Sequence, residues 1–127
     1  MINLSKKIVK ELTEGAHTAT LESYEVKEQQ RIDTETGELI KTEFLELSIK
    51  ADNEETAQPI RIYENGLNWL AQGLQSQISE LQTLDELGEI LEHIKTNKTS
   101  FKFWVRNNTV NGKTYKNFYF KDYTQNI

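Results

Sequence analysis

Aromatic and cationic side chains are concentrated in one short stretch near the C-terminal end of the chain. The segment FKFWVRNNTVNGKTYKNFYF, residues 101–120, mixes rings with Lys, Arg and Asn on both sides of an Asn-Gly pair. Flat rings stack on unpaired nucleic-acid bases, and each stacked base contributes about 1–3 kcal/mol. Lysine and arginine side chains neutralise phosphates. These residue types together predict a surface that binds a single nucleic-acid strand.

The Asn-Gly pair at positions 111 and 112 predicts a hairpin turn, because both central residues of a type I′ turn need positive φ. With this turn, Trp104 faces Tyr119 and Arg106 faces Asn117, and directly opposite residues share a face of the sheet. The register therefore sorts the hairpin into two faces. The apolar face, predicted to join the core, holds Phe101, Phe103, Val105, Phe118 and Phe120. The other face, the candidate binding surface, holds Lys102, Trp104, Arg106, Asn108, Tyr115, Asn117, Tyr119 and Lys121.

Two further observations favour a binding role for this face. Lys102 and Lys121 are predicted to lie opposite one another, and their repulsion is understandable if an anion lies between them. Phe44, Arg61 and Tyr63 fall on the outward parity of their own strands, and an exposed Phe44 would need a reason. A structural interpretation remains, since aromatic cross-strand pairs also stabilise hairpins that bind nothing.

Charge is distributed unevenly along the chain. The 127 residues carry a formal charge of -5, yet residues 99–127 hold five cationic side chains against Asp122 alone. The same segment contains eight of the twelve aromatic residues, and residues 1–98 carry a charge of -9. We therefore expect a small basic, aromatic surface on an acidic body.

The rest of the sequence predicts the elements that hold this surface. A first strand begins at Gly15, with Ala19 and Leu21 on one parity and Tyr24 and Val26 on the other, so a β-bulge is expected near residues 22–23. The polar turn DTETGE, residues 33–38, separates it from a second strand with Leu45, Leu47 and Ile49 inward. A third strand has Ile60 and Ile62 inward.

A helical segment follows the third strand, with leucines at helical spacing from Leu67 to Leu74 and again from Leu84 to Ile94. Thr83 and Glu86 predict a capping box at the second helix. Five strands with a helix between the third and fourth are the connectivity of the OB-fold, so we expect a mainly β protein with a five-stranded OB barrel over residues 14–122. Another small α+β domain with a helix-covered sheet is the alternative.

The chain also resembles a known family. The segment EGAHTA (residues 14–19), the Thr36-Gly37-Glu38 turn before FLELSI, the run IRIYENGLNWLAQGL and the aromatic last hairpin are similar to small single-stranded-DNA-binding proteins of phages and mobile elements of Gram-positive bacteria. The resemblance covers about residues 14–121. It implies sequence-tolerant binding of single-stranded DNA in replication or recombination, with Trp104, Arg106, Tyr115 and Tyr119 stacking on or clamping the strand. Many members end in an acidic tail that recruits partner enzymes, whereas this chain ends KDYTQNI.

Other kinds of chemistry find no support in the sequence. The chain has no cysteine, no phosphate-binding glycine loop, and two histidines, His17 and His93, on different elements. We therefore expect no enzyme activity, no cofactor and no metal. No apolar run approaches the roughly 20 residues of a membrane span, and the charged N-terminus does not have the pattern of a signal peptide, so a cytoplasmic protein is expected.

Residues 1–13 predict an arm or short helix with a Leu4/Ile8/Leu12 stripe, and residues 123–127 a short tail. Because one OB domain contacts only about 4–16 nucleotides, we expect a homodimer or larger homo-oligomer, with that stripe as a candidate contact, and replication or recombination proteins as further partners. Two other functions stay open. The same aromatic face would suit a protein-interaction module such as a phage factor docking on a host protein, or an RNA or oligosaccharide binder.

Overall fold

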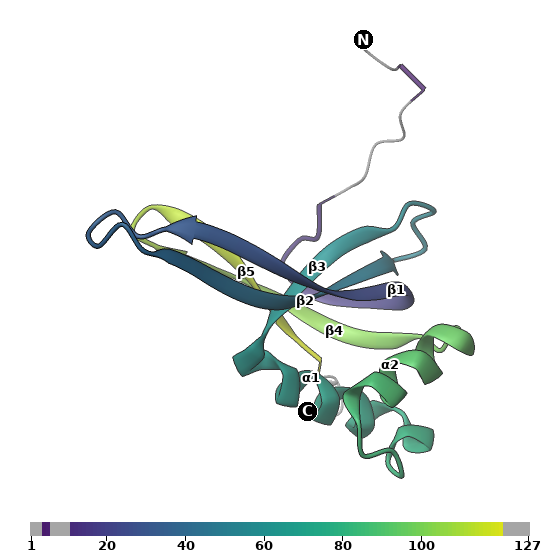
Figure 1. The fold of residues 1–127 in the computed structure, drawn as a ribbon. Coiled ribbons are helices and arrows are strands. Elements are labelled where there is room, and N and C mark those ends of the chain that lie inside the picture. The colour runs from purple at the N-terminus through teal and green to yellow at the C-terminus, as the bar shows by residue number, and fades with distance from the viewer. Residues whose placement is uncertain (1–3, 6–10, 121–127) are drawn as a thin grey trace.

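The computed structural model describes residues 4–5 and 11–120, and in these the predicted order of strands and helices is confirmed (Figure 1). Three strands come first, β1 (Gly15–Ile32), β2 (Leu39–Ala51) and β3 (Gln58–Tyr63). A helical segment follows, with α1 (Glu64–Gln77), the short 3-10 helix η1 (Ser79–Leu81) and α2 (Leu87–Thr96). The last two strands are β4 (Phe101–Val110) and β5 (Lys113–Tyr119).

The five strands form one antiparallel sheet in the order β3-β2-β1-β4-β5. β1 is the central strand, since its first part pairs with β4 and most of its length pairs with β2. In the described residues β3 and β5 are the two sheet edges, so the sheet is open. The protein is therefore mainly β, with an arrangement compatible with an OB-like barrel, but the barrel that we expected from the sequence is not closed.

The predicted β-bulge in β1 is confirmed. Leu21 pairs with Ile49, but the next paired residue is Ser23, opposite Ser48, so one residue is inserted between them. Because of the insertion, odd-numbered residues such as Ala19 and Leu21 face inward before the bulge, and even-numbered residues face inward after it, where Tyr24 packs against the core. A bulge increases the local bend and twist of a strand, and this long strand can therefore serve two parts of the curved sheet.

The helices cover one face of the sheet, where the core lies. Leu70 and Leu74 of α1 and Leu91 and Ile94 of α2 are buried, as their helical spacing predicts, and Ile90 is buried beside them. They pack with the inward residues of the strands, among them Leu47, Ile49, Ile60, Phe101 and Phe103. Trp69 lies on the outer side of α1 and is 72% exposed.

The predicted capping box at Thr83 and Glu86 is wrong. Helix α2 begins only at Leu87, and its N-cap residue Glu86 makes no side-chain capping bond. The side-chain amide of Gln75 donates to the carbonyl oxygens of Leu81 and Leu84, at 3.1 and 2.8 Å. These bonds attach the segment before α2 to the end of α1, so a tertiary contact takes precedence over the local capping signal.

The residues of the predicted N-terminal stripe, Leu4, Ile8 and Leu12, do not share one environment. Leu12 is buried in the core, whereas Leu4 is exposed, and Ile8 lies outside the described residues. Leu12 is therefore not available for contact with a second copy of the chain. The predicted tail, residues 123–127, also lies outside the described residues.

A hydrogen bond links the central strand to the helical layer. The hydroxyl group of Tyr24 donates to the Glu92 carboxylate of α2 at 2.7 Å. This bond raises the pKa of Tyr24 and lowers the pKa of Glu92, which is lowered further by the nearby charge of Lys95. The ionised carboxylate is thus stabilised in the folded protein, and its contribution is lost as the pH falls through the folded-state pKa of Glu92, below its ordinary value of 4.5.

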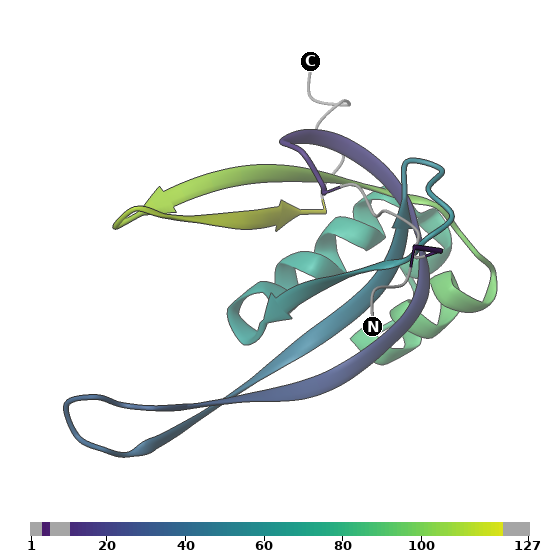
Figure 2. The same ribbon diagram turned by 90° about the horizontal axis from the view of Figure 1, so that it is seen from above.

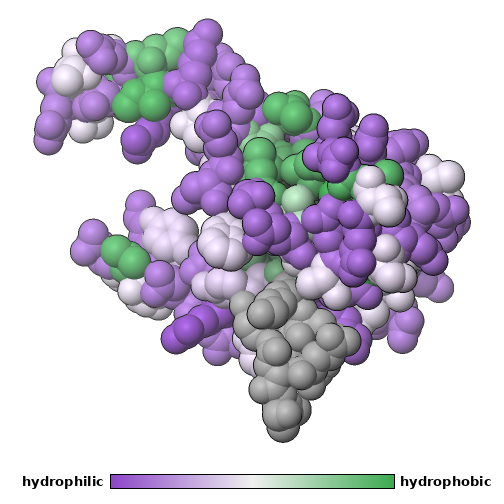
Figure 3. All heavy atoms as spheres, turned by 90° about the horizontal axis from the view of Figure 1, so that it is seen from below, coloured by the Kyte–Doolittle hydropathy of each residue, from purple (hydrophilic) through white to green (hydrophobic). Residues whose placement is uncertain are grey.

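Two hairpins project from the same side of the molecule. The β1–β2 and β4–β5 hairpins extend in similar directions, with the end of β3 and the start of α1 between them in the view of Figure 2. Figure 3 shows the open notch that separates the two hairpins. Solvent therefore reaches both faces of each hairpin in its outer half, and every residue from Arg106 to Asn117 is exposed.

Candidate nucleic-acid interface

The predicted hairpin register is confirmed from Trp104 to Val110 of β4 and from Lys113 to Tyr119 of β5. Trp104 pairs with Tyr119, Arg106 with Asn117 and Asn108 with Tyr115. The turn residues Asn111 and Gly112 have φ values of 53° and 78°, the positive values that a type I′ turn requires. The local sequence therefore sets which side chains share each face of β4 and β5.

The two faces differ in burial as the alternation predicts. Phe101, Phe103, Val105 and Phe120 are buried, and Phe118 packs partly against them. On the opposite face Trp104 and Tyr119 are each 39% exposed and Tyr115 is 53% exposed. We call this second face the outer face of the hairpin, and its described members are Lys102, Trp104, Arg106, Asn108, Val110, Lys113, Tyr115, Asn117 and Tyr119. Three partly exposed rings thus share one face of the hairpin, with the Arg106–Asn117 pair between Tyr115 and the other two.

Only cations carry charge in this hairpin. Residues 101–120 contain four cationic side chains and no acidic one, and all four are exposed. The register places Lys102, Arg106 and Lys113 on the outer face and Lys116, opposite Asn107, on the other. The sequence reasoning missed Lys113, although its pairing with Val110 follows from the same register. Lys121, the predicted partner of Lys102, lies outside the described residues, so the opposed lysine pair stays a prediction.

Gln77, at the end of α1, holds the base of the hairpin. Its side-chain oxygen accepts from the Lys102 backbone N–H at 2.6 Å, and its amide nitrogen donates to the Lys102 carbonyl at 2.7 Å and to the Phe120 carbonyl. The side chain is half-buried and bonds β4 and the residue that directly follows β5, at the end of the hairpin opposite the turn. Sequence reasoning gave no signal for this glutamine, whose partners are all backbone groups of distant residues.

A second aromatic cluster occupies the same side of the sheet on β2 and β3, but it differs from the prediction. Phe44, expected to be exposed, is 5% exposed. The Arg61 guanidinium lies over its ring at 4.6 Å, and the Tyr63 ring packs beside it at 5.8 Å. Phe44 is therefore covered by its two neighbours on the outward face and is not accessible for stacking. Tyr63 remains 41% exposed, and Arg61 is exposed.

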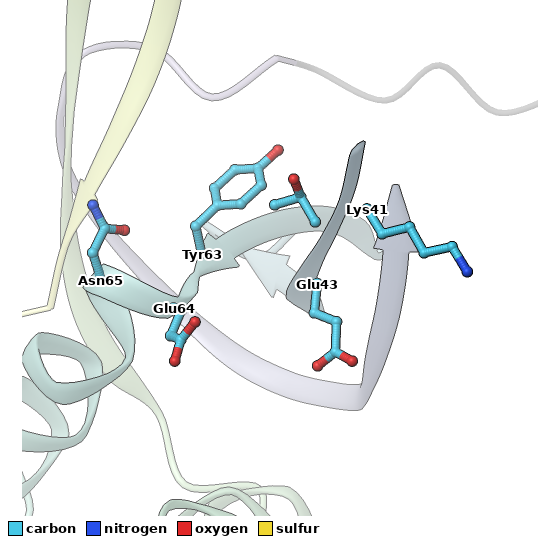
Figure 4. Close-up of a pocket in the computed structure, with 6 residues that line it drawn as sticks. Lys41, Glu43, Tyr63, Glu64 and Asn65 are labelled. Atoms are coloured by element: carbon cyan, nitrogen blue, oxygen red, sulfur yellow. The ribbon is translucent and has the colours of Figure 1, made fainter. Parts of the chain in front are cut away.

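An ion pair lies next to this cluster, on the neighbouring residues Lys27 and Glu46. The Lys27 ammonium donates to the Glu46 carboxylate at 2.8 Å, and this bond raises the pKa of Lys27. Beside Tyr63 a shallow hollow is lined by Lys41, Thr42, Glu43, Tyr63, Glu64 and Asn65. Figure 4 shows the Tyr63 ring on one side and the Glu43 and Glu64 carboxylates on the other. With two carboxylates and one ammonium, this hollow is a poor phosphate site.

The two aromatic groups lie at different ends of the central strand. Trp104 is opposite Ala16 of β1, whereas Phe44 is opposite Lys27, eleven residues further along. At about 3.3 Å per residue the separation along the bent strand is roughly 35 Å. The structure therefore places both groups on one side of the sheet as two separate patches.

A second shallow hollow lies directly beside Trp104. Its lining residues are Glu14, Gly15, Trp104, Val105 and Arg106. The β1 residues next to the indole are Ala16 and Gly15, one with a methyl group and the other with no side chain. The edge of the indole is consequently uncovered on this side.

His17 has a structural position. Its ring is buried, stacks on Phe103 with 5.4 Å between ring centroids, and bonds to Asp52 at 2.5 Å and to the Thr13 carbonyl at 2.6 Å. It links the first strand to the β2–β3 turn beneath the hairpin. Across the described ranges, no group of three or more His, Cys, Asp or Glu residues could hold a metal ion.

No family model matches the chain, and no curated protein is significantly similar to it. In the part of the chain that the structure describes, none of the helices has the length and apolar character to cross a membrane.

Proposed function

We propose that the protein binds single-stranded DNA with little sequence preference, through the outer face of the β4–β5 hairpin, in support of phage or mobile-element replication or recombination. The observation that carries the proposal is the composition of that face. Three half-exposed rings, those of Trp104, Tyr115 and Tyr119, stand among three cations with no acidic side chain in the hairpin. Rings stack on bases without regard to sequence, and cations meet phosphates.

The topology adds support to this proposal. The strand neighbours β3-β2-β1-β4-β5, with the helices between β3 and β4, are compatible with an OB-like barrel that is not closed between β3 and β5. OB-folds bind oligonucleotides with the face of their second and third strands and with the loops of the β1–β2 and β4–β5 hairpins. Tyr63 and Arg61 of β3 would then make a second contact with the strand, and the buried Phe44 ring packs against both of them.

The remaining parts of the proposal follow from the same interpretation. The protein acts in the cytoplasm of a bacterial host, as a homodimer or larger assembly, because a single small domain gains affinity for a long strand through multivalency. Replication or recombination proteins are its further partners. Residues 64–98 of the helical layer hold six acidic and two basic side chains, so we expect the strand to bind on the other face of the sheet.

A titration of labelled oligonucleotides tests the function directly. Oligo-dT, the same length of oligo-rU, a DNA duplex and an oligosaccharide are compared at low salt, and DNA binding is then followed as salt is raised. We expect oligo-dT to bind more tightly than duplex, with an affinity that falls as salt rises. No binding of any single strand at low salt would contradict the proposal and favour a protein-interaction module. Tightest binding of RNA or of the sugar would reassign the ligand.

A further inference from the structure

One acidic side chain lies at the edge of the basic outer face. Glu14 directly precedes Gly15, the first residue of β1, and it lines the hollow beside the indole together with Trp104 and Arg106. Its carboxylate oxygen Oε1 accepts the backbone N–H of Asn107 at 2.7 Å. This bond fixes the carboxylate at the rim of the hollow beside the indole.

The rest of the carboxylate is free to accept. Glu14 is exposed, and within the described residues its only hydrogen bond is the one to Asn107. An ionised carboxylate has about four acceptor sites and no donor, so one backbone N–H leaves most of its capacity unused. A carboxylate here repels phosphates, which makes it a poor addition to a surface that meets only the backbone of a strand.

A base stacked on Trp104 would present its edge to this carboxylate. Ala16 and Gly15 leave the space beside the indole open, and unpaired bases are recognised through their Watson–Crick edges while they stack on aromatic rings. Guanine has two adjacent donors on that edge, N1–H and N2–H, which match the two oxygens of a carboxylate. Thymine has one donor between two acceptors, and cytosine and adenine have an amino group beside an acceptor.

We propose that the hollow formed by Glu14, Gly15, Trp104, Val105 and Arg106 is a base subsite that favours guanine, with Glu14 as the residue that determines the preference. This inference rests on the proposed function. Trp104 stacks on the base, Glu14 accepts its N1–H and N2–H groups, and Arg106 holds the neighbouring phosphate. Binding is then tolerant of sequence along most of the strand and selective at one position.

The test compares three labelled oligonucleotides at constant salt, namely oligo-dT of 12 nucleotides and the same strand with one central guanine or one central hypoxanthine, which lacks the N2 amino group. A good bidentate contact discriminates by about 1–3 kcal/mol, and an exposed site is expected at the lower end. We therefore expect the guanine strand to bind about fivefold more tightly than oligo-dT, with hypoxanthine between them.

Two variants assign the preference to its residue. Glu14→Gln retains an oxygen that can accept from Asn107 but has lost the charge and the second acceptor. It should bind all three strands with equal affinity, and oligo-dT at least as tightly as the unchanged protein does. Asp85→Asn makes the same charge change on the exposed segment before α2 and should retain the guanine preference. Thermal denaturation checks that both variants are folded.

The outcomes separate this inference from the proposed function. If the unchanged protein binds the three strands equally, the guanine subsite is refuted while single-strand binding stands. If Glu14→Gln keeps the preference, the bond to Asn107 is the whole role of Glu14 and the inference is also refuted. If no strand binds, the proposed function itself fails.

Discussion

Lys113 offers a quantitative test of which face of the hairpin meets the strand. It pairs with Val110 on the outer face and is exposed. For single strands, each phosphate contact contributes about 0.7 to the slope of log affinity against log salt. The three outer-face cations predict a slope of about -2, and Lys113→Gln should reduce its magnitude by about 0.7 and weaken binding about fivefold at 0.1 M salt.

The matched control lies three residues away on the other face. Lys116 pairs with Asn107, is equally exposed, and loses the same charge in Lys116→Gln. Because its ammonium is on the far side of the sheet, it should change the slope little, and its residual effect is screened over about 10 Å at 0.1 M salt. Fluorescence anisotropy of labelled oligo-dT at five or more salt concentrations gives both slopes. Equal effects of the two substitutions, or a larger effect of Lys116→Gln, would refute the outer-face assignment.

Three further predictions concern the scaffold. Gln77→Ala should lower the free energy of unfolding by about 1–3 kcal/mol, measured by chemical denaturation, since it removes three hydrogen bonds to the backbone groups of Lys102 and Phe120; an unchanged stability would refute the anchoring role. Gly112→Ala should destabilise the protein by about 1–2 kcal/mol, because the φ of Gly112 is 78°. Gly88→Ala on the exposed side of α2 should stabilise the protein by about 0.5–1 kcal/mol, because the space around the added Cβ is open. Stability changes of the same sign in both variants would contradict the reasoning. Tyr24→Phe should raise the pKa of Glu92 toward its ordinary value and reduce the loss of stability on acidification below about pH 4.5. The melting temperature measured against pH tests this, and a profile identical to that of the unchanged protein would argue against the bond.

The parts of the fold that follow from local sequence could be predicted. The Asn-Gly turn fixes the hairpin register, since its backbone needs positive φ at both positions and strand alternation then assigns each face. The bulge near Ser23 could be predicted because an inserted residue shifts the alternation of apolar side chains along the strand. The same register could also have predicted that Lys113 pairs with Val110 and lies on the outer face.

The parts that depend on distant contacts could not be predicted. Parity alone put Phe44 on the outward face, but only the structure shows that Arg61 and Tyr63 cover it. The start of α2 depends on bonds from Gln75 to backbone carbonyls, and such partners leave no local pattern. Closure of a barrel depends on how two edge strands meet across the molecule, which the strand count does not determine.

Tryptophan fluorescence tests the central claim most directly, because the two tryptophans occupy different places. Trp104 lies on the outer face of the hairpin, and Trp69 lies on α1, outside that face. In Trp69→Phe the remaining Trp104 should be quenched to saturation by oligo-dT. In Trp104→Ala the remaining Trp69 should show no quench, and affinity should fall about 5- to 150-fold, as the loss of one stacked base predicts. Quenching of Trp69 with an unaffected Trp104, or unchanged affinity of Trp104→Ala, would contradict the account.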